Sequence, residues 1–523
     1  MRPVLTLKAG EQVDLSQYYV SGNGAQLTYT TSSDKVSING SIVTVAEGIE
    51  IRRFEEVTVY ASAANLQPVG ITLSLVPSVI TISSAEDLIC FAGLVNEGQT
   101  TLSGTLTADI DLTGKSFTRI GNRTYKYAGT FDGQGHSVTL DMNITGTSDA
   151  DKCQGLFGCA TGGASFSNLI IKGSVTCKAN CVAALVGETN GSGTVTISNV
   201  GCEASVNATS NYVGAFLGNN SGGNTKIIIT NCYNTGNITS GGNNFSVMGG
   251  YGSGTSTYTN VYNTGAITGP SSATGGKFVQ GNNGTCTNCY TTEAGSQAGL
   301  TTEISAASIS SGELCYKLGS AFRQVLGEGG DAYPVLDTSK PSVYQLTVSD
   351  AGYASFVPEV NVAAIPAGVE VYVGENKGSY LHLEKVTEVP ADNAFVVKGA
   401  EGNYYYNNTD AARTLSGVTN NLTFSPVALV SDGTQYCLSN LASGVGFYMV
   451  KSGTSIPARK VYLSVTTANV KDFYGFDEDD ATGISLKSFP LGEDLGEAYN
   501  LAGQRIQKMQ SGINIINGKK ILF

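Results

Sequence analysis

Charged residues, histidine, tryptophan and long apolar runs are scarce or absent in this sequence. Charged side chains make up 14% of the 523 residues, the formal net charge is −12, and there are two His and no Trp. Ordinary globular proteins carry about 25% charged residues. The shortage of Lys and Arg excludes a nucleic-acid partner, because a phosphate backbone is bound by clustered basic residues. The sequence has no run of about 18 apolar residues that would encode a membrane span.

Glycine and β-forming residues dominate what is present. The sequence contains 66 Gly, 26 Tyr and 12 Pro, and 41% of its residues are hydrophobic. Many Gly, Thr, Val and Tyr with few charged helix formers predict an all-β protein with many turns. At roughly 150 residues per domain, the length predicts three or four domains.

Two short phrases recur through the middle of the chain at intervals of 28 to 32 residues. One begins with Asn, as in "NCYNTGNI" (Asn231–Ile238), and the other ends with Gly, as in "ALVG" (184–187). A period of this size without a helical pattern predicts a parallel β-solenoid, whose coils bury their inner faces only by stacking. The repeated residues are Asn168, Asn199, Asn231, Asn260 and Asn288, and Gly158, Gly187, Gly218, Gly249 and Gly281.

The positions within each repeat predict which side chains face inward. With the repeated Asn counted as zero, we expect apolar ladders at plus one and plus seven and a ladder of Asn amides at a corner. Alternation sends the plus-two residues outward, so Tyr233, Tyr262 and Tyr290 are predicted to form an exposed ligand-binding stripe. The alternative is a structural Tyr stack that shields a corner. The ladder residues are Leu169, Val200, Cys232, Val261 and Cys289 at plus one, and Val175, Val206, Ile238 and Ile267 at plus seven.

The repeat region resembles the GLUG-repeat surface proteins of Gram-negative bacteria, over residues 82–296. "ITISSAEDLICFAGLVNEGQ" (Ile80–Gln99) is similar to the opening helix of that family, "YAGTFDGQGHSVTLDMNI" (Tyr127–Ile144) to its first coils, and "GLFG" (Gly155–Gly158) to its motif. The resemblance implies an adhesin, or an accessory region of a larger surface protein, built on a right-handed parallel β-helix.

The C-terminal segment carries a second resemblance. "YNLAGQRIQKMQSGINIINGKKILF" (Tyr499–Phe523) is similar to the β-rich tail of proteins exported by type IX secretion, where it acts as a sorting or anchoring signal. The alternative is a plain final hairpin. Both resemblances imply export to the outer surface or medium. The N-terminus has no signal peptide, so we expect that one has been removed.

The repeats divide the chain into six predicted segments. Leu314, Leu318, Phe322 and Val325 form one apolar face, which predicts a helix that caps the open end of the solenoid. The predicted segments are 1–79, an immunoglobulin-like β-sandwich; 80–296, the parallel β-helix; 297–340, the helical cap and linker; 341–466, a second β-sandwich; 467–498, an acidic linker; and 499–523, the sorting-like tail.

Catalytic residues are difficult to find. Glycosidases use two carboxylates about 5 to 9.5 Å apart, and between residues 153 and 290 the sequence offers Glu188 and Glu203 alone, with no Asp, His or Arg. The earlier coils hold more such residues, and there we interpret Asp132 and His136 as turn residues. We therefore expect no catalytic residue. The ionisable residues of the early coils are Asp109, Asp111, Arg119, Arg123, Asp132, His136 and Asp141.

Eleven Cys are scattered along the chain. A zinc site needs four well-placed ligands, and we interpret "CKANC" (Cys177–Cys181) and "CTNC" (Cys286–Cys289) as small buried hydrophobic residues. The stacking register places Cys232 and Cys289 two coils apart, about 9.6 Å, which exceeds the reach of a disulfide. We expect no metal site, no cofactor and free thiols.

These observations predict an exported, non-enzymatic, adhesin-like surface protein that binds a glycan or a host or matrix ligand through its β-helix. We expect a monomer. One alternative is a carbohydrate-active β-helix enzyme, a polysaccharide lyase or glycosidase, with its site on the early coils. The other is a structural stalk without a ligand. The absence of Trp, the usual sugar-stacking residue, speaks against a dedicated lectin.

Overall fold

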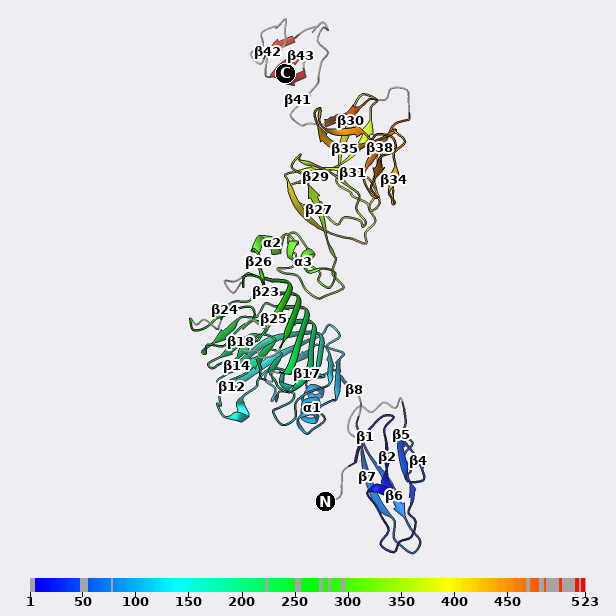
Figure 1. Cartoon of the computed structure of the whole chain (residues 1–523), viewed down its shortest axis with the longest axis vertical. Helices are drawn as coiled ribbons and strands as arrows, with labels where there is room; N and C mark the ends of the chain where they lie inside the picture. Colours follow the sequence, from blue (N-terminus) through cyan, green and yellow to red (C-terminus); the bar gives the residue numbers. More distant parts are fainter. Residues whose placement is uncertain are drawn as a thin grey trace. The chain divides into compact units, whose positions relative to one another are not determined.

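The computed structural model forms two compact units. The first comprises Met1–Ala306 with Val335–Asp337, and the second comprises Ala307–Pro334 with Thr338–Phe523. Figure 1 shows that strands, with few helices, build both units. The structure describes residues 5–47, 55–76, 79–221, 224–249, 255–271, 276–280, 284–292, 297–466 and 471–478, and four short strands beyond them.

The chain begins with a β-sandwich. Alternation in β6 turns Val57, Val59 and Ala61 toward the interior, where they pack against Val43 and Val45 of the opposite sheet. One short 3-10 turn, Leu15–Gln17, follows β2. The first sheet has the order β1 (Leu5–Lys8), β7 (Val69–Val76), β6 (Glu55–Ser62), β3 (Thr28–Thr30), and the second β2 (Gln12–Asp14), β5 (Ile42–Val45), β4 (Val36–Asn39).

A parallel β-helix follows the sandwich, as the repeat predicts. Helix α1 (Ala85–Asn96) opens it: Ser84 caps the helix by accepting from the Asp87 N–H over 3.1 Å, and its buried residues join the core of the coils. The strands of the main sheet are β8 (Val79–Ile82), β9 (Ser103–Leu106), β10 (Ile110–Asp111), β11 (Thr130–Asp132), β12 (Ser137–Ile144), β14 (Ser165–Cys177), β17 (Ser192–Cys202), β18 (Ser205–Ala208), β21 (Asn224–Asn234), β22 (Ile238–Ser240), β23 (Ser256–Asn263), β24 (Ile267–Thr268), β25 (Gly284–Thr291) and β26 (Thr302–Glu303).

Two smaller parallel sheets complete the coils. The Gly-ending phrases lead into the strands of one sheet, and the strands of the other directly precede the phrases. The turn Asp149–Asp151 precedes the first phrase. Buried apolar residues from all three sheets form one continuous core. The smaller sheets are β13 (Phe157–Ala160), β16 (Val186–Thr189) and β20 (Leu217–Asn220), and β15 (Val182–Ala183) with β19 (Val213–Gly214).

The stacking register confirms the predicted ladders. Cys232 pairs with Val261, and Val261 pairs with Cys289, so the two thiols lie two coils apart. At plus seven, Ile238 stacks between Val206 and Ile267. All eleven Cys are free.

The amide ladder at the corner is also confirmed. Each repeated Asn donates from Nδ2 to the Oδ1 of the Asn one coil earlier, over 2.9 to 3.2 Å. The first of them, Asn168, donates to Asp132 over 3.0 Å. All five have φ between 51° and 54°, a left-handed conformation that Asn tolerates better than other side chains. The repeated Asn therefore makes both the bend and the ladder.

The second unit contains two short helices, α2 (Ala306–Ser310) and α3 (Glu313–Leu318). The predicted apolar face holds for Leu314, Leu318 and Phe322, which are buried, but Val325 is exposed. The helix ends earlier than predicted because Gly319 leaves the helical conformation with φ 86°. α3 contacts β27 and β32, and the predicted capping of the β-helix stays a prediction.

The rest of this unit is a three-layer β-structure. Val371 and Val373 of β29 face one core, with Leu346 of β27, while Tyr372 between them faces a second core with Phe447 of β36. The strands are β27 (Val343–Val348), β28 (Tyr353–Phe356), β29 (Val369–Asn376), β30 (Leu381–Val386), β31 (Phe395–Gly399), β32 (Gly402–Asn407), β33 (Leu422–Thr423), β34 (Leu429–Val430), β35 (Gln435–Leu441), β36 (Gly444–Met449), β37 (Ser455–Ile456), β38 (Tyr462–Ser464), β39 (Phe473–Tyr474) and β40 (Phe476–Glu478).

The linker prediction is wrong for residues 473–478. β39 pairs with β36, β40 pairs with β30, and Tyr474 is buried. The apolar residues of this segment complete sheets that the preceding strands leave open. Four short strands follow: β41 (Ile484–Ser485), β42 (Ala498–Asn500), β43 (Ile513–Ile516) and β44 (Lys519–Leu522). Other residues of the linker and the tail lie outside the described part of the chain. Among the described helices, none is long and apolar enough to span a bilayer.

Candidate functional site

The predicted Tyr stripe is not exposed. Tyr233 and Tyr262 have no solvent-accessible surface, and Tyr290 retains 8%. The register does place the three rings on successive coils, and the rings of Tyr233 and Tyr262 stack with centroids 5.5 Å apart and planes 9° from parallel. The prediction of a ligand-binding platform at these residues is therefore wrong, because the rings offer no free face.

Neighbouring coils explain this burial. Gly201 stacks directly on Tyr233, and a side chain at Gly201 would overlap the Tyr233 ring and hydroxyl. The Tyr233 hydroxyl donates to Glu203 over 2.7 Å. The rings lie outside the main core cluster, so plus two does point away from it, as alternation requires. Alternation gives the direction of a side chain but not its exposure.

Most of the ionisable residues of the early coils bond to neighbouring backbone or turn groups. Asp109 accepts the Ser137 N–H over 2.8 Å and lies 3.4 Å from His136 Nδ1, and these bonds, that of Ser137 first, lower the pKa of Asp109. Asp132 accepts from the Gln134 N–H over 3.0 Å, as the turn interpretation expects. Asp111, Asp141 and Arg119 likewise bond to backbone groups.

The outer face of the main sheet carries two columns of hydroxyl side chains. In β17, Thr196 and Ser198 flank the buried Ile197, and the parallel register stacks each of them on an equivalent residue in the neighbouring coils. We call this surface the hydroxyl face. Its columns are Thr130, Ser165, Thr196, Ile228, Thr257 and Thr285, and Asp132, Ser167, Ser198, Thr230, Thr259 and Thr287.

The hydroxyl face is accessible and almost without charge. All of its side chains are half-buried or exposed, and Asp132 is its single ionisable member. Parallel pairing holds equivalent residues about 4.8 Å apart. Thr196 donates to Ser165 over 3.0 Å, which orients the hydroxyls of this pair. Ser and Thr hydroxyls can both donate and accept, so the face can bond to a neutral polar ligand.

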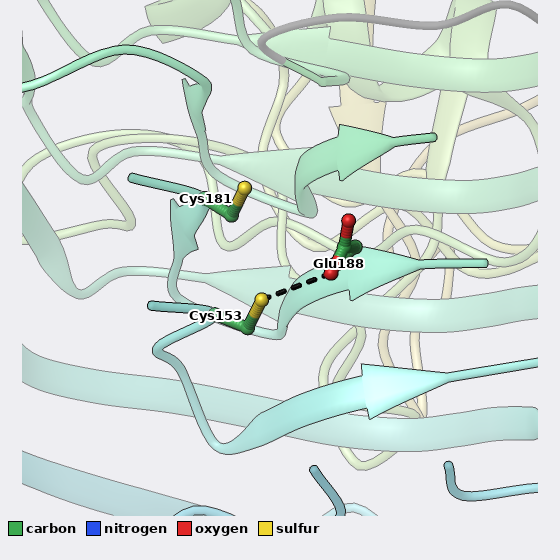
Figure 2. A group of neighbouring side chains, drawn as sticks. All are labelled: Cys153, Cys181 and Glu188. Carbon is green, nitrogen blue, oxygen red and sulfur yellow. Dashed lines mark hydrogen bonds between the residues drawn. The ribbon is translucent and has the colours of Figure 1, made fainter. Parts of the chain in front are cut away.

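A second candidate site lies where Cys153, Cys181 and Glu188 converge, in a buried cluster separate from the main core of the coils (Figure 2). Cys153 and Cys181 occupy equivalent left-handed positions of neighbouring coils, with φ 62° and 67°, because Gln154 bridges Val182 in parallel. The two Sγ atoms and one carboxylate oxygen of Glu188 lie within 4.8 Å of one another. All three residues are buried.

Glu188 is at the centre of this cluster. Its Oε2 accepts from Arg123 Nε over 2.9 Å and lies 3.0 Å from Cys153 Sγ, and its Oε1 accepts from Ser221 Oγ over 2.8 Å. Cys159, the strand partner of Glu188, brings a third sulfur to 4.0 Å from Oε2.

The thiols and the carboxyl of this cluster influence one another. Burial raises the pKa of Glu188, and the neighbouring Cys153 adds to the effect. Hydrogen bonds with Cys159 and Cys181 lower the pKa of Cys153, while the same bonds raise the pKa of those two thiols.

Comparison with known proteins adds little to this picture. No protein-family model and no curated protein matches the chain. A solved structure titled "IgA1 Protease" aligns with 58% of this chain and 29% of its own, at 13% identity and a TM-score of 0.26. The alignment thus spans less than a third of that protein, and a similarity this distant carries no argument about activity.

Proposed function

We propose that this chain is an exported, non-enzymatic, adhesin-like surface protein whose β-helix binds a neutral glycan through the hydroxyl face. The observation that carries the proposal is the pair of columns itself. Ten of the twelve column positions are Ser or Thr, and they lie at equivalent places in six successive strands.

The chemistry of the face favours a neutral polysaccharide over other ligands. An acidic glycan or a phosphate would need basic partners, and the columns contain none. A protein interface usually has an apolar centre, whereas Ile228 is the single apolar member here. Sugar hydroxyls match side chains that can both donate and accept. A repeating ligand could contact several coils at once, which raises its overall affinity without strong single contacts.

The early coils support a non-catalytic protein. Asp109, Asp132 and Asp141 each accept a hydrogen bond from a backbone N–H group, which gives these carboxylates a structural role. A glycosidase instead needs two carboxyl groups that are free to act on the substrate. Export rests on the resemblance to GLUG-repeat surface proteins and to type IX sorting tails, which stays a proposal.

Incubation of the intact chain with a panel of neutral and acidic polysaccharides tests this function. Retention on a neutral polymer whose length stays unchanged would support a binder. Shortened or unsaturated products, detected by mass spectrometry, would favour the alternative of a carbohydrate-active enzyme. Absence of retention on every polymer would contradict the proposal and favour the alternative of a structural stalk without a ligand.

A further inference from the structure

The Cys153–Cys181–Glu188 cluster has the composition of a metal site. Thiolates and carboxylates are both ligands of Zn²⁺, at about 2.3 Å for sulfur and about 2.0 to 2.2 Å for oxygen. Two ligands of one ion therefore lie less than about 4.6 Å apart, and the three ligand atoms here lie within 4.8 Å of one another, close to that limit. Small side-chain rotations would complete the coordination.

We propose that Cys153, Cys181 and Glu188 bind one thiophilic divalent cation, represented by Zn²⁺, inside the β-helix. The three residues come from two neighbouring coils: Cys153 from one, and Cys181 and Glu188 from the next. A bound ion would join these coils. Such a site is independent of the hydroxyl face, and its loss would leave the glycan proposal untouched.

Charge balance favours this set of ligands. Two thiolates and one carboxylate carry three negative charges, and the ion and the Arg123 guanidinium together carry three positive ones. A buried cluster without net charge avoids the cost of an unpaired buried ion. Arg123 is 45% exposed at its side chain while Glu188 is 4% exposed, so the ion pair joins the buried carboxylate to a partly solvated cation.

An unpartnered oxygen beside the cluster is an independent observation. Asn219 is the strand partner of Glu188 on the next coil and donates to Glu188 Oε1 over 3.4 Å. Its own Oδ1 is buried and has no hydrogen-bond partner, although the residue is 7% exposed. Buried polar atoms are normally satisfied. Asn219 Oδ1, a neutral ligand that keeps the charge balance, would serve as the fourth ligand of a tetrahedral ion.

Metal binding would release protons from the thiols. Each of the two ligand thiols loses its proton as its sulfur binds, so one Zn²⁺ displaces up to two protons and no oxidant takes part. Affinity should therefore fall as the pH is lowered. The bound ion should also raise the thermal stability of the chain, because it binds the folded state.

Titration of the reduced, intact chain with Co²⁺ tests the site directly. We expect one Co²⁺ per chain, with the intense visible absorption of a tetrahedral ion, a thiolate charge-transfer band and displacement by Zn²⁺. Cys153→Ser and Cys181→Ser should each weaken binding at least tenfold. Cys232→Ser is the matched control: that thiol is equally buried, but it lies in the plus-one ladder.

Three results would overturn the proposal. One is a wild-type chain without the charge-transfer band, and another is a band that survives both cluster substitutions. The third is a disulfide between Cys153 and Cys181 in protein whose thiols were blocked during isolation. If the Ser variants fail to fold, X-ray absorption of the Zn²⁺-loaded wild type still decides: we expect at least two sulfur neighbours near 2.3 Å, and oxygen or nitrogen neighbours alone would contradict the site.

Discussion

Gly201 leaves the space that the Tyr233 ring occupies. A methyl group there would overlap the ring, and the backbone of Gly201 is not in a conformation that requires glycine. We predict that Gly201→Ala lowers the free energy of unfolding by about 1 to 3 kcal/mol through overpacking. Chemical denaturation measures this, with Gly22→Ala as the control, because a methyl group at Gly22 meets no atom within 4 Å.

A double-mutant cycle separates overpacking from other causes. Combined with Tyr233→Ser, the Gly201→Ala substitution should cost much less than alone, with a coupling of about 0.5 to 3 kcal/mol. Strict additivity would show that Tyr233 does not cover Gly201. The same cycle also tests the burial of Tyr233, because an exposed Tyr233 would tolerate both substitutions.

Cys232 should weaken the fold at high pH. Burial raises the pKa of its thiol to about 12, whereas an unfolded Cys titrates near 8.5. Between these values the unfolded chain loses a proton that the folded chain keeps, so stability falls as the pH rises. Below about 8.5 both states are protonated and the full contribution is present.

The Cys232→Val variant isolates this effect, because Val261 already fills the equivalent position one coil later. From about pH 9 to 12, we predict that the stability of the variant falls less steeply than that of the wild type, by about 1.4 kcal/mol per pH unit. Denaturation curves across this range measure the slopes. The exposed Cys90 provides the control as Cys90→Ser, and equal slopes for wild type and Cys232→Val would refute the assignment.

At the scale of the strand, inside and outside differ by one residue. Ile238 of β22 is fully buried between Val206 and Ile267, and we predict that Ile238→Asp costs about 3 kcal/mol or more, because its charge has no partner. The adjacent Asn237 is exposed and accepts the Ala266 N–H through Oδ1. Asn237→Asp keeps that oxygen and should be nearly silent. Thermal melts of similar midpoint for the two variants would show that the strand is out of register.

At the scale of the whole molecule, the period was the most informative feature of the sequence. It predicted the parallel coils, the inward ladders and the Asn ladder, because stacking imposes the same chemistry at each equivalent position. It failed for the Tyr stripe, whose exposure depends on Gly201 and Glu203 in the preceding coil.

The same repeat spacing also brings together the residues of both candidate sites, although neither site was predicted from the sequence. Residues one repeat apart become neighbours, which brings Cys153 to Cys181 and Cys159 to Glu188. The alternating phrases "TIS" (196–198), "TYT" (257–259) and "TCT" (285–287) likewise signal the hydroxyl face. Side-chain contacts within the cluster could not be predicted, since they depend on the left-handed turns at Cys153 and Cys181.

The central claim, that the hydroxyl face binds a neutral glycan, is tested most directly by the affinity of a triple variant. Thr230, Thr257 and Thr259 changed together to Val keep their shape but lose three hydroxyls, each worth about 0.5 to 1.5 kcal/mol. Calorimetric titration with the retained polysaccharide should show at least a tenfold loss of affinity. The matched control changes Thr176, Thr239 and Thr268 to Val. These exposed residues lie at the far end of β14 and on β22 and β24, outside the two columns, and the control should bind like the wild type. Unchanged affinity in the first variant, or an equal loss in both, would contradict the account.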